Sequence, residues 1–136
     1  MKVFKSLMTM FVVGGVVIAG ASFGAAASNM TQRVAGGGVT AKVTYLNPKS
    51  ADDPRFQVAL DTHSVNLDAY DLKSSSILRD NSGKTYVPIS VENKGSGHHR
   101  EATISFPKLS PEAKRVEMVI KDIGGVKERT FTWNLE

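Results

Sequence analysis

Apolar side chains recur at every second position over most of the chain after Gly38. The stretches 39–45 and 56–60 show this alternation, and EATISF, RVEMVIK and KERTFTW repeat it in the last third of the chain. A period of two is that of a β-strand with one buried face and one exposed face. No helix-length run with a 3.6-residue period interrupts it. The pattern therefore predicts an all-β fold.

About seven short strands are predicted, separated by turn signals such as DNSG and DIGG. Pro88 falls inside the predicted strand 84–91, which indicates an edge strand or a bulge. The single helical piece expected is a turn around SPEAK, 110–114. Seven short antiparallel strands in about 100 residues are typical of an immunoglobulin-like β-sandwich, with a small open barrel as the alternative. The residues predicted to form the core are Val43, Phe56, Val58, Leu60, Ile104, Phe106, Val116, Met118, Ile120, Phe131 and Trp133.

The amino terminus has the pattern of a secretory leader. Lys2 and Lys5 precede an uncharged run, 7–27, that ends in small residues. This pattern predicts a signal peptide over 1–27 with cleavage before Ser28, and an uncleaved N-terminal membrane-anchor helix is the alternative. In both cases the rest of the chain is exported, and is periplasmic, extracellular or anchored facing outward. The glycine-rich segment 28–38 is predicted to be a flexible tether, and 39–136 the folded domain.

Charge and cysteine content exclude several classes of partner and several kinds of site. Without Lys2 and Lys5 the chain has 15 basic and 13 acidic residues, interleaved rather than segregated, so no nucleic-acid surface is expected. The absence of cysteine excludes disulfides, a lipid-modified cysteine and a blue-copper site. The partners expected are an envelope protein or a cell-surface component. Contact with the membrane is expected only through an uncleaved N-terminal segment.

The chain's three histidines lie in two polar stretches, LDTHSVNLD and GSGHHR. Together with Asp61, the residues His63, His98 and His99 would supply a ligand set for Zn²⁺ or Cu²⁺ if the fold brought them together. The other interpretation is that they are exposed loop histidines, hydrogen-bonded to nearby carboxylates, with no cofactor.

Arg100 also has two interpretations, as a fork for a carboxylate or phosphate and as a residue at a strand start that pairs with an acid such as Asp61 or Glu101 or faces water. We favour an internal anchor, made by an ion pair or by hydrogen bonds that hold this turn against LDTHS. We predict that GSGHHR lies beside LDTHSVNLD, with an imidazole close to Asp61 or Asp68 and with Arg100 holding the turn. Arg100 and Asp68 would then form a structural motif rather than a binding site.

The segment VALDTHSVNLD, taken with GHHR, resembles a group of small exported bacterial β-sandwich proteins of unknown function. Members carry a V-A-L-D-T-H-S-V-x-L-D segment and a Gly-His-His-Arg turn ahead of a strand. The resemblance covers most of the chain after Gly38. It implies the same type of module and assigns no catalytic role to any residue.

Other sites are less well supported by the residues. The aspartates at 61, 68, 71 and 80 lack EF-hand spacing, which leaves only a looser Ca²⁺ site as an alternative. His63 and Ser64 are sequence neighbours, and adjacency is no evidence for a nucleophile with its base. We therefore expect no catalytic residues and no enzyme. The sequence favours a non-enzymatic exported β-sandwich module of the cell envelope that acts in binding, and a small exported metal-binding protein is the alternative.

Overall fold

The structure is a computed structural model that describes residues 30–95 and 97–136. The predicted leader, or anchor helix, lies outside these residues. Within them, no helix has both the length and the apolar character that a membrane crossing requires.

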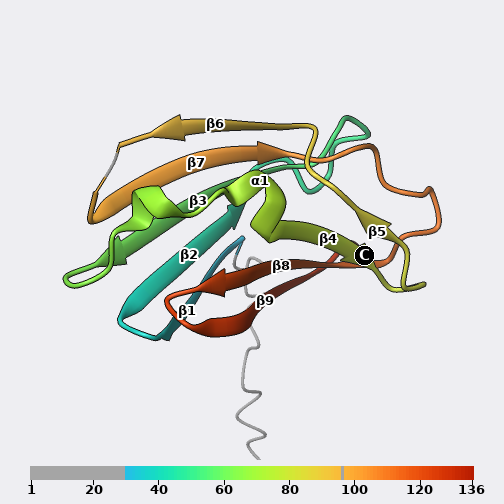
Figure 1. Cartoon of the computed structure of the whole chain (residues 1–136). Helices are drawn as coiled ribbons and strands as arrows, with labels where there is room; N and C mark the ends of the chain where they lie inside the picture. The colour runs from blue at the N-terminus through green and yellow to red at the C-terminus, as the bar shows by residue number, and fades with distance from the viewer. Residues whose placement is uncertain (1–29, 96) are drawn as a thin grey trace, which may run out of the picture.

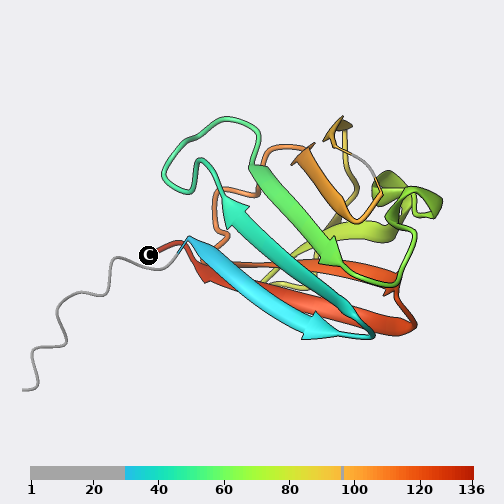
Figure 2. The same cartoon turned by 90° about the vertical axis from the view of Figure 1, so that its left-hand side faces the viewer.

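In the described part of the chain, nine strands form two antiparallel sheets that pack face to face (Figure 1, Figure 2). The strand order is β1-β2-β3-β7-β6 in the first sheet and β5-β4-β8-β9 in the second. The first sheet contains β1 (Thr31–Gly36), β2 (Val39–Tyr45), β3 (Arg55–Thr62), β7 (His99–Ser105) and β6 (Ser90–Lys94). The second contains β5 (Thr85–Tyr86), β4 (Ser76–Asp80), β8 (Arg115–Ile123) and β9 (Val126–Asn134), and the β3–β4 connection carries η1 (Leu67–Ala69) and α1 (Leu72–Ser75).

This order is that of an immunoglobulin-like sandwich. The run β2-β3-β7-β6 corresponds to strands A-B-E-D of that fold, and β5-β4-β8-β9 to C′-C-F-G. The predicted fold class is confirmed. Strand β1 is an addition before strand A, and it pairs with β2 along its whole length.

Two predictions about local structure are wrong, and a third is incomplete. Thr31–Gly36, assigned to the tether, forms β1 because its polar residues need only one covered face at a sheet edge. The predicted strand 84–91 divides into β5 and β6, in different sheets, because Pro88 cannot donate to a ladder. SPEAK is a turn, as expected, but the short helices lie elsewhere, at 67–75.

The core is continuous between the two sheets. Every residue predicted to belong to it is buried. Tyr45 stacks on Phe56 with 4.4 Å between ring centroids, and the Trp133 ring lies 5.2 Å from Phe56. These offset and tilted ring pairs contribute about 0.5–1.5 kcal/mol each beyond the area they bury.

Side chains close one side of the sandwich between β1 and β9, which are both edge strands. The Gln32 amide accepts a hydrogen bond from the Thr132 amide nitrogen at 3.0 Å and donates one back to the Thr132 carbonyl. The Trp133 indole nitrogen donates to the Met30 carbonyl at 3.0 Å. Both edges are thereby covered, which removes templates for unwanted strand pairing.

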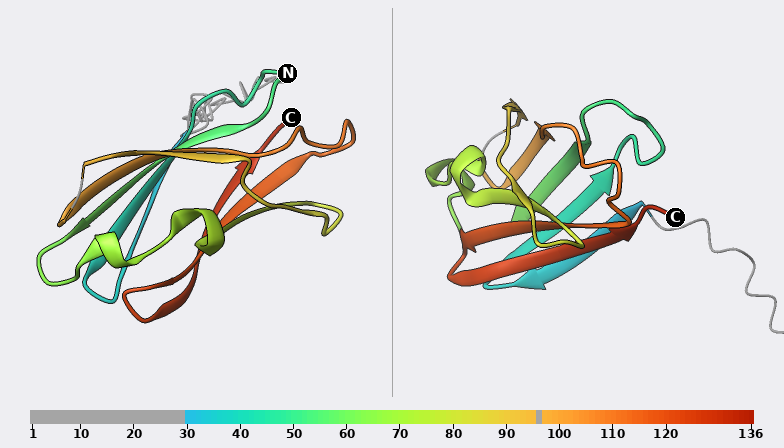
Figure 3. Two further views of the ribbon diagram at one scale, coloured as in Figure 1. Left: turned by 45° about the horizontal axis from the view of Figure 1, so that its top comes forward. Right: turned by 90° about the vertical axis from the view of Figure 1, so that its right-hand side faces the viewer.

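The connections between strands gather at two opposite ends of the sandwich (Figure 3). One end holds the β1–β2, β6–β7 and β8–β9 turns and the β3–β4 connection. We call it the histidine end, because His63 and His98 lie in these connections. The opposite end holds the β2–β3, β4–β5 and β7–β8 connections and the carboxyl terminus, and we call it the terminal end. Each end carries one candidate site.

Candidate functional site

The two polar motifs meet at the histidine end, as predicted. Asp61 and His99 are partners in the β3–β7 ladder, and the His99 Nδ1 atom is hydrogen-bonded to the Asp61 Oδ1 atom. The backbone nitrogen of Thr62 donates to the carbonyl of His98 at 3.0 Å. The GSGHHR turn therefore lies directly against LDTHS.

Asp68 fixes the same turn from the other side. Its two carboxylate oxygens accept hydrogen bonds from the Gly97 amide at 3.0 and 3.1 Å. The Leu67 amide donates to the carbonyl of Gly97 at 3.3 Å. Together these bonds attach the tip of the β6–β7 hairpin to η1.

Arg100 is buried beneath these contacts, with 8% of its surface exposed. Its Nη1 atom donates to the carbonyl of Leu67 at 2.9 Å and also to that of Tyr70. Its Nε and Nη2 atoms donate to the Asn93 Oδ1 atom at 3.2 and 2.8 Å. The predicted anchoring role is confirmed. Of the two forms expected for this anchor, an ion pair or hydrogen bonds, the described residues show hydrogen bonds, to two loop carbonyls and one side-chain amide.

Replacing Arg100 by alanine is expected to lower the free energy of unfolding by about 2–3 kcal/mol, or the melting temperature by roughly 10 °C or more. The reason is that the carbonyls of Leu67 and Tyr70 each lose a charged donor, and the Asn93 side chain loses two donated bonds. Calorimetry of the variant measures the change. Arg79→Ala, which removes a long 3.8 Å surface pair with Glu117, is the matched control and should cost less than about 0.5 kcal/mol. Equal effects of the two variants would contradict the anchoring role.

The histidines do not form a ligand cluster. In residues 30–95 and 97–136, no group of three or more His, Asp or Glu side chains could hold a metal ion. His99 and Asp61 are paired, while His63 and His98 are exposed loop residues. The predicted four-residue set thus reduces, in this part of the chain, to one pair, which is fewer ligands than a stable Zn²⁺ site uses.

The aspartates considered for Ca²⁺ serve separate local networks. Asp61 pairs with His99, Asp68 holds Gly97, and Asp71 accepts from the Lys73 amide at 3.0 Å as the cap of α1. Asp80 belongs to the terminal end. These carboxylates organise turns at four different places.

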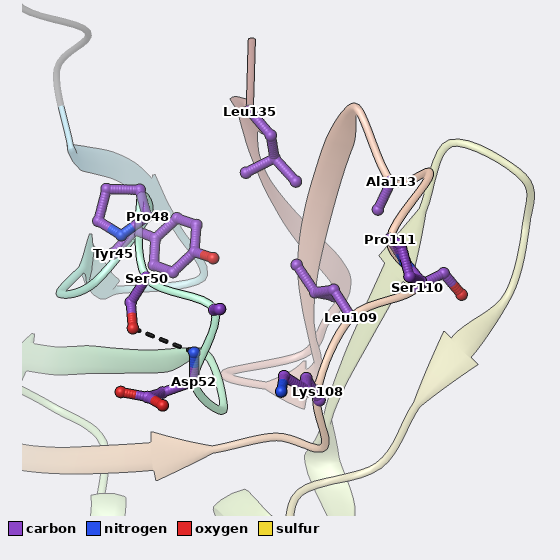
Figure 4. Close-up of a pocket in the computed structure, with 11 residues that line it drawn as sticks. Tyr45, Pro48, Ser50, Asp52, Lys108, Leu109, Ser110, Pro111, Ala113 and Leu135 are labelled. Carbon is purple, nitrogen blue, oxygen red and sulfur yellow. Dashed lines mark hydrogen bonds between the residues drawn. The ribbon is translucent and has the colours of Figure 1, made fainter.

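A second candidate site, which the sequence did not predict, is a pocket of about 460 Å³ at the terminal end. We call it the terminal pocket. Figure 4 shows Tyr45 and Pro48 on one side and Leu109 on the other, with Leu135 above and Asp52 and Lys108 at the lower border. Its volume lies in the ~300–1,000 Å³ range of small-molecule sites. The lining residues are Tyr45, Pro48, Ser50, Ala51, Asp52, Lys108, Leu109, Ser110, Pro111, Ala113 and Leu135.

Hydrogen bonds fix both walls of the terminal pocket. In the β2–β3 loop, the Asn47 amide donates to the Asp53 carbonyl at 2.9 Å and accepts from the Arg55 amide at 2.8 Å. In the β7–β8 loop, the Ser110 amide donates to the Tyr86 hydroxyl at 3.0 Å, and that hydroxyl donates to Asp80 at 3.0 Å. The pocket is therefore preformed rather than created by a ligand.

Asp80 makes the stability of this wall depend on pH. The hydrogen bond from the Ser82 hydroxyl, together with those from Tyr86 and from two backbone amides, lowers the pKa of Asp80 below its usual value. A lowered folded-state pKa stabilises the fold above the unfolded-state pKa of about 3.9, and this contribution is lost as the pH falls through the folded-state pKa.

We therefore expect Asp80→Asn to cost about 1 kcal/mol at neutral pH, with the difference from the native protein shrinking as the pH falls below about 4. Urea unfolding at a series of pH values measures it. Asp71→Asn, an exposed cap, is the comparison. A difference for Asp80→Asn that stays constant into acid would show that its charge has no role.

The terminal pocket was missed because most of its residues come from loops without periodicity. The prolines of NPKSADDP and SPEAK mark the two loops as turns but do not show that they face each other. Arg129, which is buried at the histidine end with 1% exposure, was missed as well. It had a signal, because it lies two positions before Phe131 in the inward phase of β9.

No protein-family model matches this chain, and no curated protein matches it. Among solved structures, the chain is similar to the crystal structure of a DUF4426 family protein from Pseudomonas aeruginosa. The two are 15% identical, the match covers 76% of this chain and 93% of that one, and the TM-score is 0.48. A similarity of this size transfers neither a family nor a function.

Proposed function

We propose that this chain is a non-enzymatic, exported β-sandwich module of the cell envelope that binds an envelope component at its terminal end. One observation carries the proposal: a preformed and largely apolar pocket opens between two loops that are each held by their own hydrogen bonds. A concave apolar site with a few convergent polar groups is the commonest form of a binding site.

Two further features support this assignment. Large apolar side chains are exposed near the pocket, with Leu46 43% and Ile89 51% exposed. Leu46 directly follows Tyr45 of the pocket, and Ile89 lines a neighbouring hollow that shares three residues with it. The most conspicuous polar residues of the sequence, Arg100 and Asp68, are engaged in holding loops. Export itself follows from the leader pattern at the amino terminus.

The test is photocrosslinking in intact bacteria that export the full chain. A photoreactive phenylalanine analogue replaces Leu109 in the pocket, or Lys73 at the histidine end as the matched control. We expect a discrete adduct in the envelope fraction from position 109 and none from position 73. No adduct from either position, or the same adducts from both, would contradict a binding role for the terminal end.

A further inference from the structure

A second hollow continues the terminal pocket along the end of the sandwich. We call it the charged hollow. It shares Ser50, Asp52 and Lys108 with the terminal pocket, so the two are contiguous. Its lining residues are Asn47, Ser50, Asp52, Asp53, Arg55, Ile89, Ser90, Ser105 and Lys108. The end of the sandwich therefore offers one site with an apolar part and a charged part.

The charged hollow presents both signs of charge. Arg55 and Lys108 supply two cations, and Asp52 and Asp53 supply two anions. All four residues are exposed, and within the described residues none of their side chains has a hydrogen-bond or ion-pair partner. These charges are therefore available to a ligand, and a ligand that matches them carries both a negative and a positive group.

Resting on the proposed function, we infer that the site binds a single-chain zwitterionic amphiphile, with its alkyl chain in the terminal pocket and a phosphate-ammonium head in the charged hollow. Lys108 and Arg55 face the phosphate, because a cation and a guanidinium fork are the usual partners of phosphate oxygens. Asp52 and Asp53 face the ammonium group. The apolar lining of Leu109, Leu135 and the neighbouring prolines receives the alkyl chain.

The charge balance excludes simpler ligands from this inference. A purely anionic head beside Lys108 would also meet the Asp52 carboxylate, which lines both hollows. An uncharged alkyl chain would fill the terminal pocket and leave the charged hollow unused. Chain length should matter as well, since about 0.8 kcal/mol per buried methylene makes the loss of two methylenes worth roughly tenfold in affinity.

The experiment uses the exported protein and three probes of equal chain length, below their micelle-forming concentrations. They are a single-chain phospholipid with a phosphoethanolamine head, one with a phosphoglycerol head, and the alkyl alcohol. Native mass spectrometry gives the stoichiometry and affinity, and the fluorescence of Trp133, whose ring is 5.8 Å from that of Tyr45 in the pocket, gives a second readout. We expect one-to-one binding of the phosphoethanolamine probe, at least tenfold tighter than the other two.

Variants of the charged hollow test which residues bind the phosphate and which bind the ammonium group. The double variant Arg55→Ala, Lys108→Ala should bind the phosphoethanolamine probe at least tenfold more weakly than the native protein does. The double variant Asp52→Asn, Asp53→Asn should no longer bind the phosphoethanolamine probe more tightly than the phosphoglycerol probe. The double variant Lys127→Ala, Glu128→Ala, on the β8–β9 hairpin at the opposite end, is the matched control. Its affinity for each of the three probes should equal that of the native protein.

The outcomes separate this inference from the proposed function. Equal binding of all three probes, unaffected by the charge variants, would overturn the zwitterionic ligand and leave an apolar binding pocket. Binding of no probe, with a protein adduct from position 109 in the crosslinking test, would overturn the ligand class and leave the binding module. Binding of no probe and no adduct would overturn both.

Discussion

Replacing Arg129 by alanine is expected to lower the free energy of unfolding by about 4 kcal/mol, a large part of the total stability of a domain of this size. Arg129 is 1% exposed and has the largest fully buried side chain among the described residues. Its Nη1 atom donates to the carbonyl of Ile123 and its Nη2 atom to that of Gly36, both at 2.6 Å. The variant removes the guanidinium donor from both carbonyls and leaves a cavity beside them.

Arg129 joins two hairpins that are far apart in sequence. Ile123 precedes the β8–β9 turn and Gly36 precedes the β1–β2 turn. Burial lowers the pKa of Arg129. Because a guanidinium stays protonated at any ordinary pH, the cost of burying its charge is always present. The hydrogen bonds to the two carbonyls offset that cost.

Denaturant unfolding of three variants tests this account. Arg129→Met keeps the apolar stem and removes both bonds, so it should be destabilised by about 2–3 kcal/mol, less than the alanine variant. Lys127→Ala, an exposed residue of the same strand, should stay within about 0.5 kcal/mol of the native protein. A methionine variant as stable as the native protein would show that the arginine is not needed to join the hairpins.

The second large effect is expected at Gly37, where alanine should cost about 3 kcal/mol or more. Gly37 has a φ of +60°, and a Cβ atom there would lie 2.0 Å from the backbone oxygen of Gly124. Backbone on the opposite hairpin cannot move aside without breaking the contacts that Arg129 makes. The positive φ adds about 1 kcal/mol, since an L side chain is strained in the left-handed region.

Gly83→Ala is the matched control for Gly37→Ala. Gly83 has a φ of +88°, but no atom lies within 4 Å of the position of its Cβ. It therefore carries the conformational cost alone, about 1 kcal/mol. Thermal unfolding of both variants gives the difference, which is the cost of separating the two hairpins. If both variants lose the same stability, the contact between the β1–β2 and β8–β9 turns does not contribute to the stability of the fold.

The phase of the alternation also contains a signal for buried polar residues outside the predicted core. Arg100, Arg129 and Asp80 each stand at a position whose neighbours two residues away face inward. Phase therefore indicates burial for all three, and a buried polar side chain requires hydrogen-bonding partners. The proximity of the two polar motifs was predicted because the histidines and carboxylates were concentrated in them, and it is confirmed at His99 and Asp61.

The partners themselves could not be predicted, because most of them are backbone atoms. The acceptors of Arg100 and Arg129 include the carbonyls of Leu67, Ile123 and Gly36, which any residue at those positions would supply. Composition also led to the wrong prediction of a tether at Thr31–Gly36, because an edge strand covered on one face needs few apolar residues. The terminal pocket depends on how two loops approach each other, and loops have no period from which this could be read.

The closure between β1 and β9 limits the order in which this chain can fold as it is synthesised. The Gln32 and Thr132 bonds span 100 positions, and the Met30 and Trp133 bond spans 103. Contacts of such separation form only after nearly the whole chain is available, which makes folding slow relative to local structure. A chain that emerges amino terminus first must therefore wait for its last strand before these bonds can form. Until then the edge of β8 is unpaired, and the emerging chain is in its most aggregation-prone state.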